Sequence, residues 1–170
     1  MTEPDPDPPA RALPLTTAEI DLFTTALPAT GRLIGIDGGT TTLGLALSDI
    51  SRTIASPLET IERTKFKADA ARLLALIAEH NVCGLVLGLP TNMDGSLGPR
   101  VQATRALARN LNGLTPIPIL LWDERLTTAA AERMLIAADT SRKRRSEVID
   151  KLAATLILQG ALDRIRNARF

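Results

Sequence analysis

The apolar positions of the chain fall into short runs and helical stripes. Two apolar runs, 32–37 and 43–48, flank the turn residues 38–42, and this pattern predicts a β-hairpin. A weaker third strand follows at 53–61, where Pro57 indicates an edge position or a bulge. The first part of the chain is therefore expected to form three consecutive strands.

The remainder alternates between helical and strand patterns. Continuous apolar runs at 83–89 and 118–122 are typical of strands buried on both faces. Helical patterns cover four segments: 66–80, 97–111, 128–138 and 146–166. Periodicity by itself indicates a mixed α/β sheet with helices on both faces. The order β-β-β-α-β-α-β-α-α is that of the ribonuclease-H-like fold, a mixed five-stranded sheet flanked by helices.

The N-terminal part differs in composition from the rest. Residues 1–30 hold one basic and five acidic residues, while residues 31–170 hold 19 basic and 14 acidic ones. We interpret 1–30 as an acidic, proline-rich leader, disordered over 1–14 with a short helix at 17–26. Residues 31–166 form the predicted folded domain, which is mildly basic although the whole chain has a net charge of only +1.

Composition excludes several classes of site. Aromatic residues make up 2% of the chain, which disfavours nucleic-acid binders that stack bases on aromatic side chains. One cysteine and one histidine exclude a disulfide framework and metal sites built on these residues. Neither a signal peptide nor a membrane span is predicted, so we expect a cytoplasmic protein without membrane contact. Catalysis, if present, has to rest on carboxylates.

Asp37 ends the first apolar strand and precedes Gly38. It shares a strand face with Leu33 and Gly35. One interpretation is a turn-forming Asp at the start of a hairpin, and the other is a metal ligand at the centre of the sheet.

Asp123 and Glu124 end the strand at 118–122, at the sheet edge where α/β proteins bind ligands. Adjacent residues point in opposite directions, so we expect only one of them to join Asp37. The alternative is a polar strand end in which Arg125 pairs with one carboxylate.

Asp150 lies within the apolar arc of the last helix, between Ile157 and Ala161 on the helical surface. A carboxylate in that position needs a partner or a metal ion, because burial without one is costly. A salt bridge to an arginine, or a partly exposed flank, is the other interpretation. Three carboxylates on three elements suit Mg²⁺, with Mn²⁺ as an alternative. Two such ions can support phosphodiester hydrolysis.

Basic residues surround these acids in the sequence. Arg142, Lys143, Arg144 and Arg145 precede Asp150 at the start of its helix, where they oppose the helix dipole. We interpret them as a phosphate-binding patch, together with Arg100 and Arg125, rather than as a solvated surface run. Arg100 ends a polar loop over 88–100 that leads into a helix N-terminus.

Three sequence blocks carry a family resemblance. They are GRLIGIDGGTTTLGLALSD at 31–49, GLPTNMDGSLGPR at 88–100, and WDERLTTAAAERML at 122–135 with its continuation SRKRRSEVIDKLAATLILQGALD at 141–163. Together they resemble the YqgF family of Holliday-junction-resolvase-like proteins, the pre-16S rRNA nucleases. The chain departs from the family pattern at Gly38, where a bulkier residue is usual, and at Thr41, where Lys or Arg is common.

The resemblance implies a ribonuclease-H-like fold and a metal-dependent nuclease that trims the 5′ end of precursor small-subunit ribosomal RNA. It implies that Asp37, Glu124 and Asp150 are the catalytic metal ligands, and it selects Glu124 over Asp123. The expected partners are structured RNA and the small-subunit precursor, with a monomer or a dimer both compatible. Alternatives are a resolvase acting on branched DNA and a non-catalytic ribosome-associated RNA-binding factor. A fourth, an actin-like or sugar kinase, would need two lobes.

Overall fold

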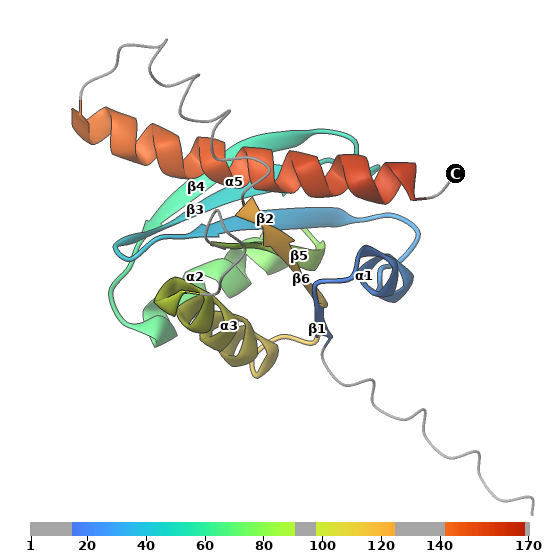
Figure 1. The fold of residues 1–170 in the computed structure, drawn as a ribbon, viewed down its shortest axis with the longest axis horizontal. Helices are drawn as coiled ribbons and strands as arrows, with labels where there is room; N and C mark the ends of the chain where they lie inside the picture. The colour runs from blue at the N-terminus through green and yellow to red at the C-terminus, as the bar shows by residue number, and fades with distance from the viewer. Residues whose placement is uncertain (1–14, 91–97, 125–141, 169–170) are drawn as a thin grey trace, which may run out of the picture.

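A computed structural model describes residues 15–90, 98–124 and 142–168 of the chain. Within these residues, six strands form one sheet in the order β1-β6-β5-β2-β3-β4 (Figure 1). The strands are β1 (Thr16–Thr17), β2 (Arg32–Gly38), β3 (Thr42–Ser48), β4 (Ala55–Glu62), β5 (Val82–Leu89) and β6 (Ile119–Asp123). The predicted hairpin is the antiparallel pair β2–β3, and β5 runs parallel to both β2 and β6.

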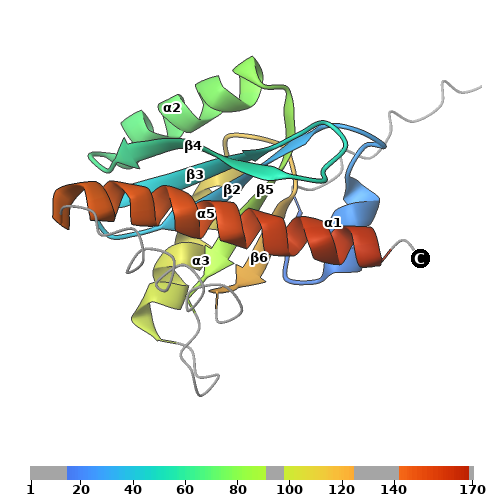
Figure 2. The ribbon, with the colours of Figure 1, turned by 90° about the horizontal axis from the view of Figure 1, so that it is seen from above.

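Helices cover both faces of the sheet. They are α1 (Ile20–Ala26), α2 (Phe66–Glu79), α3 (Pro99–Asn112) and α5 (Arg142–Asn167). The long helix α5 lies along one face, while α2 and α3 lie on the other (Figures 1 and 2). Of the helices that the structure describes, none combines the length and apolar character that a membrane crossing requires. The predicted mixed α/β architecture is confirmed.

The expected five strands become six. Thr16 and Thr17 form β1, which pairs parallel to Ile119 and Leu120 at the start of β6. The helix expected at 17–26 therefore begins only at Ile20, and its Phe23 is completely buried. A two-residue strand has no hydrophobic period of its own, so the sequence pattern could not reveal it. The leader residues 1–14 and the helix expected at 128–138 lie outside the described residues.

The edge strand β4 carries the predicted irregularity. Its register against β3 shifts between Leu45 and Ala46, where Ala46 pairs with Pro57. Proline lacks an amide hydrogen and fits a sheet only at an edge or a bulge. Pro57 lies both on the edge strand and next to the register shift. The sequence prediction for this strand is confirmed.

Two apolar cores lie on opposite faces of the sheet. The core under α2 and α3 is built from large aliphatic side chains, including Ile36, Leu45 and Leu87. The core under α5 includes Leu33, Ala46, Val86, Leu120 and the apolar residues of α5 itself. Successive side chains of a strand point to opposite faces, so each central strand contributes to both cores. This alternation decides which residues at the strand ends face α5.

Candidate active site

Asp37 lies at the end of β2 on the face covered by α5. Leu33, four residues earlier and therefore on the same face of the strand, belongs to the core under that helix. Asp37 pairs with Gly44 of β3, and the register Ile36–Leu87 puts Gly88 of β5 beside it on the other side. A partly buried carboxylate is thus flanked by a glycine on each neighbouring strand.

Gly44 allows α5 to approach the sheet closely. A Cβ atom added at Gly44 would lie 2.1 Å from the carbonyl oxygen of Asp150 and 3.0 Å from its Cβ. Such distances are far below van der Waals contact, so any side chain at Gly44 would displace the helix backbone. The absence of a side chain therefore brings Asp150 to the end of the hairpin.

Gly88 makes room for Glu124. A Cβ atom added there would lie 2.5 Å from Glu124 Oε1 and 2.6 Å from Ile157 Cδ1. Glu124 follows the last residue of β6, which lies on the far side of β5 from Asp37. Its side chain occupies the space above Gly88 and reaches Asp37, with which it shares a hydrogen bond.

The alternation along β6 explains why Glu124 rather than Asp123 meets Asp37. Leu121 packs against the core under α2 and α3, whereas Trp122 packs against the core under α5. Asp123 pairs with Leu89 at the last position of the strand. Glu124, one residue further, is back on the α5 face.

The two neighbouring carboxylates disturb each other's protonation. Burial, followed by repulsion from Asp37, raises the pKa of Glu124 to about 7. Burial also raises the pKa of Asp37, and the hydrogen bond from Glu124 opposes that rise. The two carboxyl groups together therefore retain a proton to a higher pH than an isolated carboxyl group does.

Asp150 reaches the same end of the sheet from α5. Its charge adds to the rise in the pKa of Asp37, which means that it lies within electrostatic range of that carboxylate. Asp150 Oδ2 accepts a hydrogen bond of 2.5 Å from the Thr42 hydroxyl at the start of β3. Over the described part of the chain, no three metal-ligating side chains lie close enough together to hold an ion as they stand.

The structure describes only some of the basic residues that the sequence places near the site. The charge of Arg100, in the first turn of α3, lowers the pKa of both Asp37 and Glu124, and its Nη2 lies 3.4 Å from the Gly38 carbonyl oxygen. Arg142, Lys143, Arg144 and Arg145 form the first turn of α5. Arg125 lies outside the described residues.

Thr42, Gly44 and Gly88 contact the acids of the candidate site, although the sequence pattern does not single them out as site residues. Alternation along β3 carries a signal for Thr42, because Thr42, Gly44 and Ala46 share the face that packs under α5. Nothing in the pattern indicates that a glycine in a strand makes room for a carboxylate of another element.

Comparison with known proteins agrees with this architecture. A family model described as "RuvX: Holliday junction resolvase" matches residues 31–164. A solved structure of Thermus thermophilus RuvC in complex with a Holliday junction substrate is similar in fold, with a TM-score of 0.51 and 18% identity. The similarity covers 79% of this chain and 96% of the RuvC chain. The fold is therefore ribonuclease-H-like.

Curated relatives are much closer in sequence. A protein of Paracoccus denitrificans named "Putative pre-16S rRNA nuclease" is 62% identical over 147 residues, which are 86% of this chain and 93% of the relative. A protein of the same name from Cereibacter sphaeroides (strain ATCC 17025) is 64% identical over 146 residues, covering 86% and 91% of the two chains. The resemblance seen in the sequence blocks is confirmed, and the chain belongs to the RuvX (YqgF) family.

Proposed function

We propose that this protein is a metal-dependent endonuclease that processes the 5′ end of precursor small-subunit ribosomal RNA. The observation that carries the proposal is the meeting of Asp37 and Glu124 at the end of a ribonuclease-H-like sheet, with Asp150 within electrostatic range. Its relatives of about 60% identity are named for a pre-16S rRNA nuclease activity, which supports the RNA substrate.

The carboxylate pair fits a divalent cation. Two acids that share one proton in a partly buried site repel each other once ionised, and a cation placed between them would remove that repulsion. Asp37 and Glu124 would hold Mg²⁺ or Mn²⁺, with Asp150 as the third carboxylate. Their oxygens are the hard ligands these ions prefer. When bound, the ion supplies Lewis acidity and activates water for phosphodiester hydrolysis.

The chain's own residues bind and orient the substrate. Thr42 fixes the Asp150 carboxylate through its hydroxyl, so that this acid faces the end of the hairpin. Arg100 puts positive charge beside the carboxylate pair, where a scissile phosphate would bring negative charge. Arg142, Lys143, Arg144 and Arg145 in the first turn of α5, together with Arg125, would neutralise further phosphates of the backbone.

A nuclease acting on branched DNA is the second candidate. The description of the matching family model as a Holliday junction resolvase favours it. The same three carboxylates would serve either substrate, because the chemistry at the phosphodiester is the same. The two substrates differ in the shape of the backbone, which recognition without aromatic stacking would have to read.

The deciding experiment compares cleavage of a 5′-extended precursor of small-subunit RNA with cleavage of a four-way DNA junction, each with Mg²⁺ and with EDTA. We expect the RNA to be cut only with the metal, and Asp37→Asn to reduce cleavage below detection while folding and RNA binding persist. Asp163→Asn is the matched control, since Asp163 lies on α5 but pairs with the exposed Arg166 at 2.9 Å. Full activity of Asp37→Asn, or activity in EDTA, would refute the proposed chemistry, and preferential junction cleavage would favour the second candidate.

A further inference from the structure

A recess lies on the α3 side of the β2–β3 turn. It is lined by the turn residues Gly38, Gly39 and Thr40, by Arg63 and Arg100, and by the neighbouring side of α3. Its volume of about 60 Å³ can admit several water molecules or one phosphate group. Its polar groups are the turn backbone, threonine hydroxyl groups and two guanidinium groups, and apolar atoms, including those of Ala103 and Leu107, line the rest.

Both arginines are anchored on the turn from different elements. Arg63, one residue after β4, donates from Nη1 to the Gly39 carbonyl oxygen at 2.7 Å. Arg100, in α3, donates from Nη2 to the Gly38 carbonyl oxygen at 3.4 Å. Both side chains are exposed, and each anchoring bond uses one of the five N–H groups of a guanidinium. The remaining donors give each arginine capacity for an anion.

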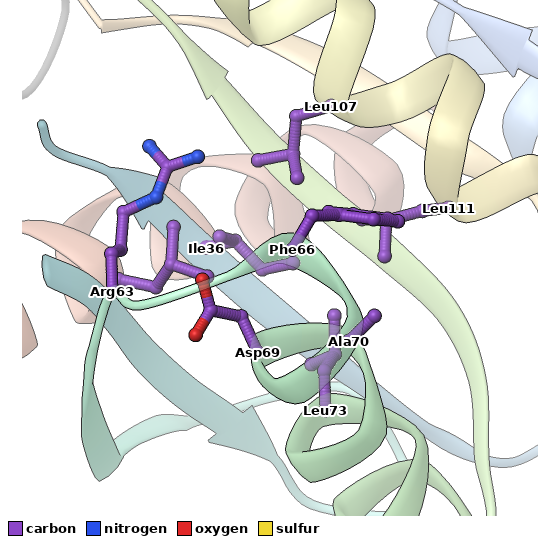
Figure 3. Close-up of a pocket in the computed structure, with 9 residues that line it drawn as sticks. Ile36, Arg63, Phe66, Asp69, Ala70, Leu73, Leu107 and Leu111 are labelled. Atoms are coloured by element: carbon purple, nitrogen blue, oxygen red, sulfur yellow. The ribbon is translucent and has the colours of Figure 1, made fainter.

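Among the side chains that the structure describes (residues 15–90, 98–124 and 149–168), no carboxylate lies within 4.0 Å of the side-chain nitrogens of Arg63. Its neighbour Asp69 accepts instead from the Thr64 backbone N–H at 3.2 Å. Figure 3 shows the Arg63 guanidinium extending away from Asp69, on the side of Leu107 of α3. By contrast, the exposed Arg72 forms an ion pair with Glu59 at 2.6 Å.

The recess and the carboxylate site lie at the same end of the sheet but on opposite faces. A Cβ atom added at Gly38 would point towards Leu107 and Leu43, which belong to the core under α2 and α3. Asp37, the preceding residue, points towards α5. A ligand that reaches both places therefore has to pass over the end of β2. A polymer with repeated phosphates can do this, whereas a single small anion cannot.

We propose that Arg63 extends the positive charge of Arg100 into a phosphate subsite for the nucleic-acid backbone, at a nucleotide away from the cleaved bond. The substrate class rests on the proposed function, but binding at the recess does not depend on cleavage. Arg63 contributes charge, and its anchor on Gly39 fixes that charge relative to Asp37, two residues earlier in the chain. The subsite extends the contact surface from the α5 side of the hairpin to the α3 side.

The test measures binding of a fluorescein-labelled RNA hairpin with a 5′ single-stranded extension in EDTA, by fluorescence anisotropy over a series of salt concentrations. Arg63→Gln keeps an N–H donor for the Gly39 carbonyl but removes the charge, whereas Arg63→Lys keeps the charge. We expect Arg63→Gln to bind several-fold more weakly, with a salt slope smaller by about one, and Arg63→Lys to restore most of the affinity. Arg72→Gln is the matched control, because Arg72 is exposed but paired with Glu59.

Cleavage kinetics and thermal unfolding complete the experiment. Arg63→Gln should raise KM more than it lowers kcat, and its melting temperature should stay near that of the wild type. If Arg63→Gln binds RNA with the affinity and salt slope of the wild type, Arg63 only holds the turn and the proposed subsite is wrong. A wild-type protein that binds through Arg63 but never cleaves would contradict the proposed function while leaving the subsite intact.

Discussion

Two adjacent residues of β2, Ile36 and Asp37, meet opposite surroundings. Ile36 faces α2 and α3 and is flanked by Leu45 and Leu87 on the neighbouring strands. Asp37 faces α5, and its flanking residues are Gly44 and Gly88. At this end of the sheet, aliphatic side chains of the strands themselves fill the space on the α2 and α3 face. On the α5 face, the two glycines leave that space free for other elements.

The difference shows how a carboxylate cluster is built into a sheet. The space above Gly44 is filled by the backbone of α5 at Asp150, and the space above Gly88 by the side chain of Glu124. Elements distant in sequence therefore supply the acids, while β3 and β5 supply only room. On the other face, the side chains of Leu45 and Leu87 fill the space on either side of Ile36.

The largest combined effect, on stability and on activity together, is expected for Gly44→Ala. The added methyl group would overlap the Asp150 carbonyl oxygen, and a helix backbone cannot yield as a side-chain tip can. We expect a loss of about 3 kcal/mol in the free energy of unfolding and loss of cleavage activity in the molecules that still fold. Denaturant unfolding and activity per folded molecule measure the two effects. Gly113→Ala, where the nearest atom would be 3.4 Å away, should change neither.

Leu45→Ala should destabilise the core under α2 and α3 without lowering the activity of the carboxylate site. Leu45 is completely buried next to Ile36, so truncation creates a cavity and costs about 2–5 kcal/mol of stability. Activity per folded molecule should stay near that of the wild type, since the carboxylates lie on the α5 face. A loss of activity as large as that of Gly44→Ala would contradict the separation of the two faces.

Gly88→Ala should lower the cleavage rate strongly while costing little stability, which is the reverse of the effect expected for Leu45→Ala. Its added methyl group meets the flexible ends of Glu124 and Ile157 rather than backbone, so these side chains can move at a cost of about 1 kcal/mol. The displaced Glu124 would no longer meet Asp37, and we expect a large fall in cleavage rate. Wild-type activity in a folded Gly88→Ala protein would show that the Glu124 position is not critical.

Glu124→Gln should produce a gain in stability without metal that is confined to high pH. The raised pKa of about 7 means that the folded protein holds this proton more tightly than the unfolded chain. The corresponding stability is complete below the ordinary Glu pKa and is lost as pH rises through 7. In EDTA, Glu124→Gln should therefore melt above the wild type at about pH 8.5 and near it at about pH 5. An equal difference at both values would contradict the shared proton.

Much of the fold could be predicted because its elements have strong local patterns. The hairpin, the buried strand β5 and the long helix α5 each carry a hydrophobic period over several residues. Strand β1 was missed because two threonines carry none, and its place is set by pairing with Ile119 and Leu120. Pairing partners are long-range information that a local pattern does not contain.

The sequence by itself determined which acids are available to the site and the faces on which Asp37 and Asp150 lie. Alternation put Asp37 on the face of Leu33, and helical spacing put Asp150 within the apolar arc of α5. Only the tertiary structure decided that Glu124 shares a proton with Asp37, that Thr42 holds Asp150, and that Arg63 is anchored on the turn. The physical reason is that these contacts join separate elements, and their approach depends on the space that Gly44 and Gly88 leave open.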